Sequence, residues 1–162
     1  MMTMIIYNDP ETGILVEMFP CLHETNPATD KPFTVQEIAD KDVPDGVPYS
    51  IVEDSTIPTD QSFRDAWKGV GIGTTGAIIT EDITKAKEIH KSNIRNTRKP
   101  LLSALDVDFQ RALETSADTS VIVAKKQALR DAPAASGITT AANVTDLKAQ
   151  WDTSILGTSP YS

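Results

Sequence analysis

The fold of this 162-residue chain is decided by residues 81–114, which read EDITKAKEIHKSNIRNTRKPLLSALDVDFQRALE. Apolar side chains recur there every three to four positions over about thirty residues, the period of an amphipathic α-helix. The stripe comprises Ile83, Ala86, Ile89 or His90, Ile94, Leu101, Leu105, Phe109 and Ala112. Because Pro100 removes a backbone donor, we expect a kink there or a break into two collinear helices.

A second helix follows this long one. Residues 115–118 are typical of a turn, with Asp118 as N-cap, and Val121, Ala124, Ala128 and Leu129 form an apolar face. The sequence therefore predicts an antiparallel helical hairpin over 80–152, with a short last helix starting at Asn143. Residues 153–162 are rich in Ser, Thr, Gly and Pro and are predicted to form a flexible tail.

Residues 1–79 predict a small β-rich unit. Apolar runs at 4–7 and 13–19 flank turn residues and indicate a hairpin, and residues 47–52 indicate a third strand, with Pro48 at its start or on an edge. Thr34 and Glu37 have capping-box spacing and predict a helix ending near Asp42. The fold class is α+β: this unit followed by the helical hairpin.

Charge divides the chain unevenly. Residues 1–80 hold 13 acidic and 4 basic residues, whereas residues 81–162 hold 10 acidic and 11 basic residues. The formal net charge of the whole chain is −8. A net negative charge disfavours non-specific binding to nucleic acid or anionic lipid. The single cysteine, Cys21, allows no internal disulfide and indicates a reducing compartment. Neither a signal peptide nor an apolar run of about 18 residues is apparent, so no membrane association is expected.

One segment matches a cofactor motif by its letters alone. Residues 71–76 read GIGTTG, the dinucleotide-binding pattern, which requires a preceding strand and a following helix to hold a pyrophosphate. Here residues 77–80 predict a strand instead. We therefore interpret the segment as a flexible loop and expect no cofactor.

Other chemistry-bearing patterns are incomplete. Residues 40–46 resemble a calcium loop, but the third acidic residue and the glycine fall one position late. His23 and His90 lack nearby second ligands, so no metal site is expected, and both are interpreted as surface or partly covered histidines. Without a nucleophile elbow or carboxylate pair, the chain is not expected to be an enzyme.

Six cations lie close together on the long helix: Lys85, Lys87, Lys91, Arg95, Arg98 and Lys99. They support an alternative function, a nucleic-acid-associated regulatory protein using the basic face 85–99. No aromatic residue suited to base stacking accompanies them, so a solvated face or an acidic protein partner is favoured.

Several fragments together resemble small tailed-bacteriophage proteins encoded with the tail fibres. Between residues 43 and 151 they are 43–52 (VPDGVPYSIV), 57–60 (IPTD), 63–67 (FRDAW), 82–90 (DITKAKEIH), 94–95 (IR) with Arg98, 105–114 (LDVDFQRALE) and 126–131 (KQALRD). The glycine-rich loop and the C-terminal tail depart from that pattern.

The resemblance implies a protein without an active site that assists fibre assembly as a chaperone or stays on the virion tail as an accessory component. It implies a fibre or other tail protein as partner, in the host cytoplasm during assembly, and a homo-oligomer is also considered. The residues expected to contact a partner are Phe63, Arg64, Trp67, Arg95, Arg98 and Lys99. Core packing is the competing interpretation of Phe63, Trp67 and Trp151, and is favoured for at least two of them.

Overall fold

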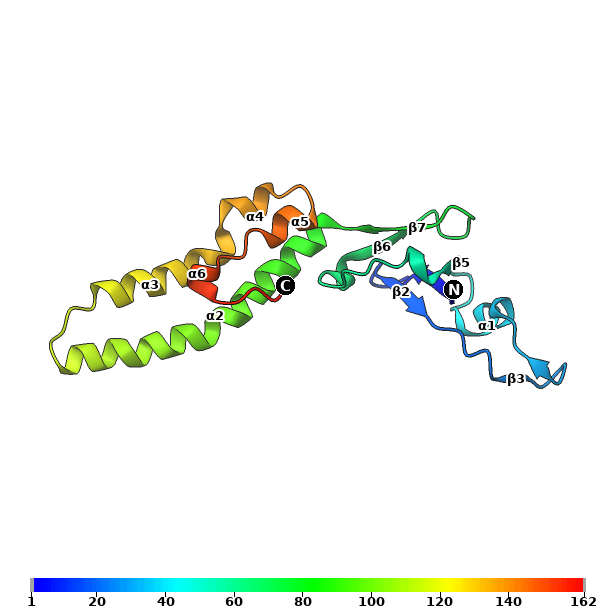
Figure 1. Ribbon diagram of the computed structural model, residues 1–162, viewed down its shortest axis with the longest axis horizontal. Helices are drawn as coiled ribbons and strands as arrows, with labels where there is room; N and C mark the ends of the chain where they lie inside the picture. The colour runs from blue at the N-terminus through cyan, green and yellow to red at the C-terminus, as the bar shows by residue number, and fades with distance from the viewer. Residues whose placement is uncertain (1, 162) are drawn as a thin grey trace. The chain divides into compact units, whose positions relative to one another are not determined.

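A computed structural model describes residues 2–161, with the mixed helix and strand content shown in Figure 1. The chain forms two compact units, Met1–Asp82 and Ile83–Ser162. The boundary thus falls three residues after the predicted one, because strand β7 (Ile78–Glu81) belongs to the first unit.

The first unit is built on a three-stranded antiparallel sheet in the order β2-β1-β5. Its strands are β1 (Thr3–Asn8), β2 (Leu15–Met18) and β5 (Tyr49–Glu53), which confirms all three predicted strands. Helix α1 (Val35–Asp42) begins with the predicted capping box. The intervening loop carries a two-residue ladder of β3 (Thr25–Asn26) and β4 (Lys31–Pro32), and a 3₁₀ turn, η1 (Asp54–Thr56), follows β5.

The two faces of this sheet pack against different elements. On one face Ile5 packs with Ile38, Ala39 and Val43 of the α1 region. On the other face Ile6 and Leu15 pack with Trp67. Because successive side chains of a strand point to opposite faces, Ile5 and Ile6 supply one core each.

Trp67 belongs to a second hairpin, formed by β6 (Trp67–Val70) and β7 after the 3₁₀ turn η2 (Arg64–Ala66). The Asn8 side chain joins it to β1: Nδ2 donates to the Gly69 carbonyl at 2.9 Å, and the Gly69 N–H donates to Oδ1 at 2.8 Å. A Cβ on residue 69 would lie 2.5 Å from Ile72 Cδ1 and 3.0 Å from Leu15 Cδ1. Glycine therefore allows β6 to approach the sheet closely.

Replacing Asn8 by alanine is expected to lower the free energy of unfolding by about 1–2 kcal/mol, because two partly buried backbone groups lose their partner. Chemical denaturation measures the change. Asn96→Ala, at an exposed position on the long helix, is the matched control and should leave stability unchanged or slightly raised. Equal stability of Asn8→Ala and wild type would contradict the role given to this amide.

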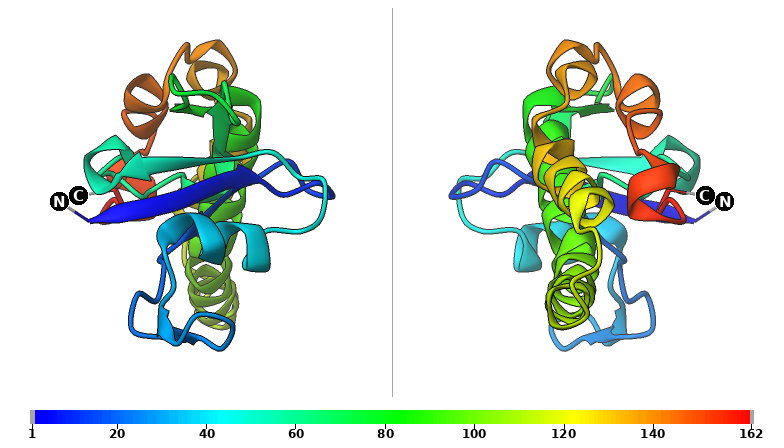
Figure 2. Two further views of the ribbon diagram at one scale, coloured as in Figure 1. Left: turned by 90° about the vertical axis from the view of Figure 1, so that its right-hand side faces the viewer. Right: turned by 90° about the vertical axis from the view of Figure 1, so that its left-hand side faces the viewer.

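The second unit is helical. It consists of α2 (Ile83–Glu114), α3 (Ser120–Asp131), the 3₁₀ turn η3 (Ala132–Ala134), α4 (Ser136–Thr140), α5 (Val144–Lys148) and α6 (Thr153–Leu156). Arg98 on α2 donates to the Leu129 and Arg130 carbonyls at 3.2 and 2.7 Å, and Lys126 on α3 lies 2.5 Å from Asp106. These contacts place α3 beside α2, as Figures 1 and 2 show. Asn143 caps α5 as predicted.

Of the two outcomes expected at Pro100, a kink or a break into two helices, the break is wrong, because α2 is one continuous helix through this residue. Proline at this position deprives the Asn96 carbonyl of its helical donor. Asn96 and Pro100 are both exposed, so that carbonyl lies on the solvent side of the helix, where water can replace the lost partner.

The predicted flexible tail over 153–162 is also wrong for its described residues. Leu156 is buried, and the Trp151 indole donates to the Gly157 carbonyl at 3.1 Å. Tyr161 stacks on His90 of α2, with 5.5 Å between ring centroids and 2.8 Å between its hydroxyl and His90 Nδ1. His90 is completely buried, contrary to the expectation of a surface or partly covered histidine. Burial of these rings holds the segment against α2.

Candidate partner-binding surfaces

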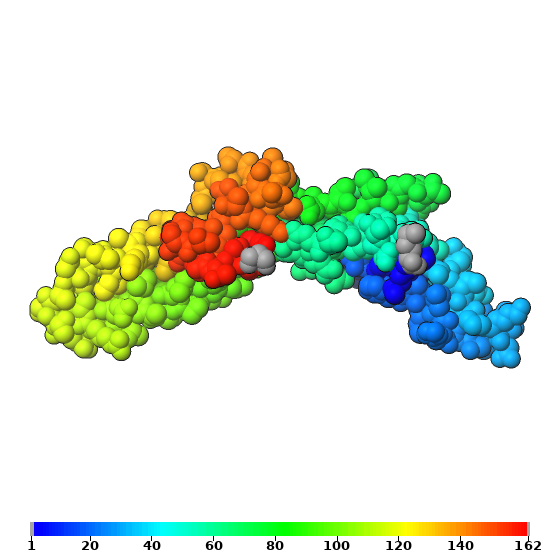
Figure 3. All heavy atoms as spheres, viewed as in Figure 1, coloured from blue at the N-terminus to red at the C-terminus, as the bar shows by residue number. Residues whose placement is uncertain are grey.

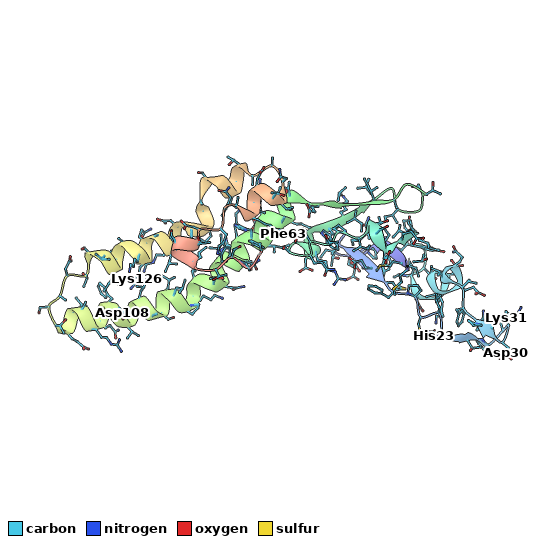
Figure 4. All side chains as sticks on the ribbon, viewed as in Figure 1. His23, Asp30, Lys31, Phe63, Asp108 and Lys126 are labelled. Atoms are coloured by element: carbon cyan, nitrogen blue, oxygen red, sulfur yellow. The ribbon has the colours of Figure 1, made fainter. Side chains whose placement is uncertain are left out.

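Two of the six residues expected to contact a partner lie in the core. The side chains of Phe63, labelled in Figure 4, and Trp67 are only 2% and 1% exposed to solvent. Trp151 is buried as well. Core packing is thus confirmed for all three aromatic residues, and the assignment of Phe63 and Trp67 to a binding surface is corrected.

Arg64 is accessible but is bound to its own unit. Its Nη2 lies 3.5 Å from Oε2 of Glu17, whose side chain is only 4% exposed. Glu17 Oε1 is buried without a hydrogen-bond partner among the described residues. A nearly buried carboxylate requires a neighbouring cation. Arg64 therefore has a structural role as the counter-ion of Glu17 on β2, and a partner would have to compete with that contact.

The basic face of α2 is largely engaged within the second unit. Arg98 binds the last carbonyls of α3, Lys87 donates to the Thr139 carbonyl at 2.7 Å, and Lys91 pairs with Glu88 at 2.8 Å. Arg95 and Lys99 stay exposed, and Lys99 donates only to Asn96 at 3.3 Å. A cation at a helix C-terminus stabilises that helix end, so Arg98 has a structural role. No feature of this face favours nucleic acid over protein.

The glycine-rich segment 71–76 joins two antiparallel strands, β6 and β7. The Gly73 N–H donates to Ser50 Oγ at 2.8 Å, and the Thr74 hydroxyl and N–H both donate to the Gly71 carbonyl. The helix N-terminus that a dinucleotide site needs is replaced here by a strand. The interpretation as a loop agrees with this setting, and Ser50 fixes the loop to β5.

Strand β5 forms an open edge of the sheet, as Pro48 indicated. Among residues 2–161 it pairs with β1 alone. The Asp54 N–H donates to the Met2 carbonyl, so these two residues form a hydrogen-bonded pair. Hydrogen-bonded and non-hydrogen-bonded pairs alternate along an antiparallel ladder. Ser50 and Val52, four and two positions before Asp54, therefore direct their backbone groups toward β1. The backbone N–H and C=O groups of Tyr49, Ile51 and Glu53 consequently point to the outer edge. The Ile51 side chain is 39% exposed beside them.

A second open surface is the arm, defined here as residues 95–128 of α2, the turn and α3. No residue of the arm is buried, although the structure describes all of them. Val107, Leu113, Val121 and Val123 are between 46% and 61% exposed. In the view of Figure 3 no further segment covers the tips of α2 and α3. Helices in proteins gain most of their stability from packing against other elements, so this exposed surface is suited to a protein partner.

The described residues contain no group of three or more His, Cys, Asp or Glu side chains arranged to hold a metal ion. Across residues 2–161 no helix has the length and apolar character needed to cross a membrane.

No protein-family model, curated protein or solved structure matches this chain. The resemblance expected from the fragments between residues 43 and 151 consequently stays a prediction, and the open edge of β5 is a surface on which to test it.

Proposed function

We propose that this chain is a non-enzymatic bacteriophage protein that binds a tail-fibre protein, as an assembly chaperone or as an accessory component of the virion tail. One observation carries the proposal: the outer edge of β5, where the backbone groups of three residues have no strand partner among residues 2–161 and lie beside an exposed Ile51. Such an edge can accept an extended segment of another protein as a fourth strand. The binding would take place in the host cytoplasm during assembly.

The chemistry of a fibre before assembly fits this edge. Chains that later pair through strands expose unpaired edges and apolar surface until they associate. A binding protein that adds one strand satisfies those groups temporarily. The first unit carries 15 acidic and 4 basic residues, a formal net charge of −11, which keeps copies of the unit apart while the edge stays open.

In the same proposal, α2 and α3 form the helical hairpin expected from the sequence. Two contacts at different positions along the helices join α2 to α3: Arg98 donates to the α3 carbonyls, and Lys126 pairs with Asp106. Lys126 also lies 5.0 Å from the centroid of the Phe109 ring, a cation–π contact. Such a hairpin offers an elongated surface in addition to the strand edge.

The test is co-expression with the fibre protein encoded beside this gene. Wild type should give a co-purifying complex and a higher soluble yield of fibre. Ile51→Pro removes a donor from the outer edge and no bond to β1, and is expected to weaken the complex about tenfold, measured by titration of the purified partners. Absence of both complex and yield increase would contradict the proposal.

Ile78→Lys provides the matched control for a second edge variant, Ile51→Lys. Both residues are exposed strand isoleucines, but Ile78 lies on the β6–β7 hairpin and pairs with Val70. A lysine on an edge strand disfavours strand addition, so Ile51→Lys should weaken the complex, whereas Ile78→Lys should not. Equal effects of the two lysines would show that β5 is not the contact.

A further inference from the structure

The arm has an outward face on α2 that is exposed along its whole length. Residues that follow the helical period from Lys99 share this face, and every one of them is exposed. They are Lys99, Pro100, Ser103, Ala104, Val107, Gln110, Arg111 and Glu114. Val107 is 46% exposed, and its neighbours one turn earlier, Ser103 and Ala104, are small, so another helix can approach closely on that side.

One cation and one anion of this face lie at nearly equal distances on either side of Val107, and Arg111, four residues after Val107, lies 3.8 Å from Asp108 of the same helix. Lys99 precedes Val107 by eight residues and Glu114 follows it by seven. At a rise of about 1.5 Å per residue, the two charges lie about 12 and 10.5 Å from Val107 along the axis. Lys99 and Glu114 thus lie at nearly equal distances from Val107 along the helix axis. Arg95 lies one turn before Lys99, whereas Asp118 lies outside α2, where its carboxylate accepts from the N–H and the hydroxyl of Ser120.

We propose that a second copy of this chain covers the face, with the two α2 helices antiparallel and a two-fold axis beside Val107. Lys99 of each copy then lies opposite Glu114 of the other. A parallel arrangement would instead place like charges together, which disfavours it. Glu114 has no ion-pair partner within residues 2–161, so it is available for this contact.

The rest of the molecule agrees with dimerisation through the arm. The second unit holds 8 acidic and 11 basic residues, a formal net charge of +3, so repulsion between its copies is small compared with that between first units at −11. The symmetric contact is isologous, the commonest type in homodimers. It would cover Val107, Ser103 and Ala104, which are exposed in the single chain. This proposal is independent of fibre binding through β5.

Sedimentation velocity of the full chain over a range of concentrations, together with light scattering, tests the proposal. Wild type should be a dimer. In the Lys99→Glu dimer, the introduced glutamate of each copy would face Glu114 of the other, which should weaken the dimer about tenfold or more. Glu114→Lys should weaken it to a similar extent, because two lysines then face each other at both contacts. The double variant Lys99→Glu with Glu114→Lys restores opposite charges and should return the dissociation constant to near the wild-type value.

Lys68→Glu, at an exposed position on β6, is the matched control with the same change of charge and should leave the dimer intact. Circular dichroism of each variant shows whether α2 and α3 remain helical. A monomeric wild type, a larger oligomer, or a dimer indifferent to both single reversals would overturn the proposal. Failure of the double variant to restore the dimer would overturn the antiparallel pairing.

Discussion

Replacing Trp67 by alanine is expected to lower the free energy of unfolding of the first unit by about 3–5 kcal/mol. The side chain is 1% exposed and packs with Ile6 and Leu15, and partly buried residues such as Val52 and Ile79 border this cluster. Alanine would remove the largest side chain of this cluster and its packing against the three-stranded sheet. Urea or guanidinium denaturation, monitored by far-ultraviolet circular dichroism, gives the change.

The same variant separates a core role from a binding role. Lys68→Ala, at the exposed neighbouring position on β6, is the control and should change stability by less than about 0.5 kcal/mol. If Trp67 instead belonged to a binding surface, Trp67→Ala would leave stability nearly unchanged and weaken partner binding. A loss below about 1 kcal/mol would therefore contradict the placement of Trp67 in the core.

Local sequence patterns predicted most individual elements. The Thr34 and Glu37 spacing identified α1 because the capping box is formed by side chains three positions apart. The apolar period located α2 within a few residues, and Pro48 pointed correctly to an edge strand. These signals lie within single turns or strands, so they do not depend on the rest of the chain.

Features that depend on distant contacts could not be predicted in this way. The segment after Asp152 has the composition of a loose tail, yet Tyr161 packs on His90, which lies 71 positions earlier in the chain. The break expected at Pro100 did not allow for an exposed carbonyl at Asn96. Composition describes a segment alone, whereas burial depends on its neighbours in space.

The candidate partner-contact residues were predictable only in part, for the same reason. Residue type alone does not distinguish a buried Trp67, or an Arg98 bound to backbone carbonyls, from an exposed residue that can contact a partner. The open edge of β5 depends on strand order, because a strand is an edge only if no other strand follows it in the sheet. The symmetry of Lys99 and Glu114 about Val107 is readable in the sequence once α2 is known to continue past Pro100.

His90 is expected to make the stability of the second unit depend on pH. Burial lowers the pKa of its imidazole from 6.5 to about 4, because the charged form loses solvation. Its Nε2 is buried without a partner among the described residues, and its ring also meets Trp151 edge-on at 6.1 Å. The neutral imidazole is thus the form that the folded chain accommodates.

The sign of the effect follows from proton uptake. Between pH 6.5 and pH 4 the unfolded chain binds a proton at residue 90 that the folded chain does not, so acid favours unfolding. The contribution of His90 is complete above pH 6.5 and is lost as pH falls toward 4. Between pH 7.5 and pH 5 the loss amounts to about 2 kcal/mol.

Denaturation at several pH values between 7.5 and 5 measures this loss, and His90→Phe isolates it. Phenylalanine keeps a ring to stack on Tyr161 but cannot titrate, so the variant should lack the His90 part of the slope whatever its stability at pH 7.5. His23→Gln, at an exposed loop position, is the control and should keep the wild-type slope. The measurements stop at pH 5 because two carboxylates also contribute in stronger acid. Side-chain hydrogen bonds from Ser120 and Ser154 lower the pKa values of Asp118 and Asp152, so protonation of these carboxylates destabilises the fold as pH falls further. If wild type and His90→Phe show parallel curves down to pH 5, His90 is not held neutral by burial, and the packing of Tyr161 over its ring would have to be revised.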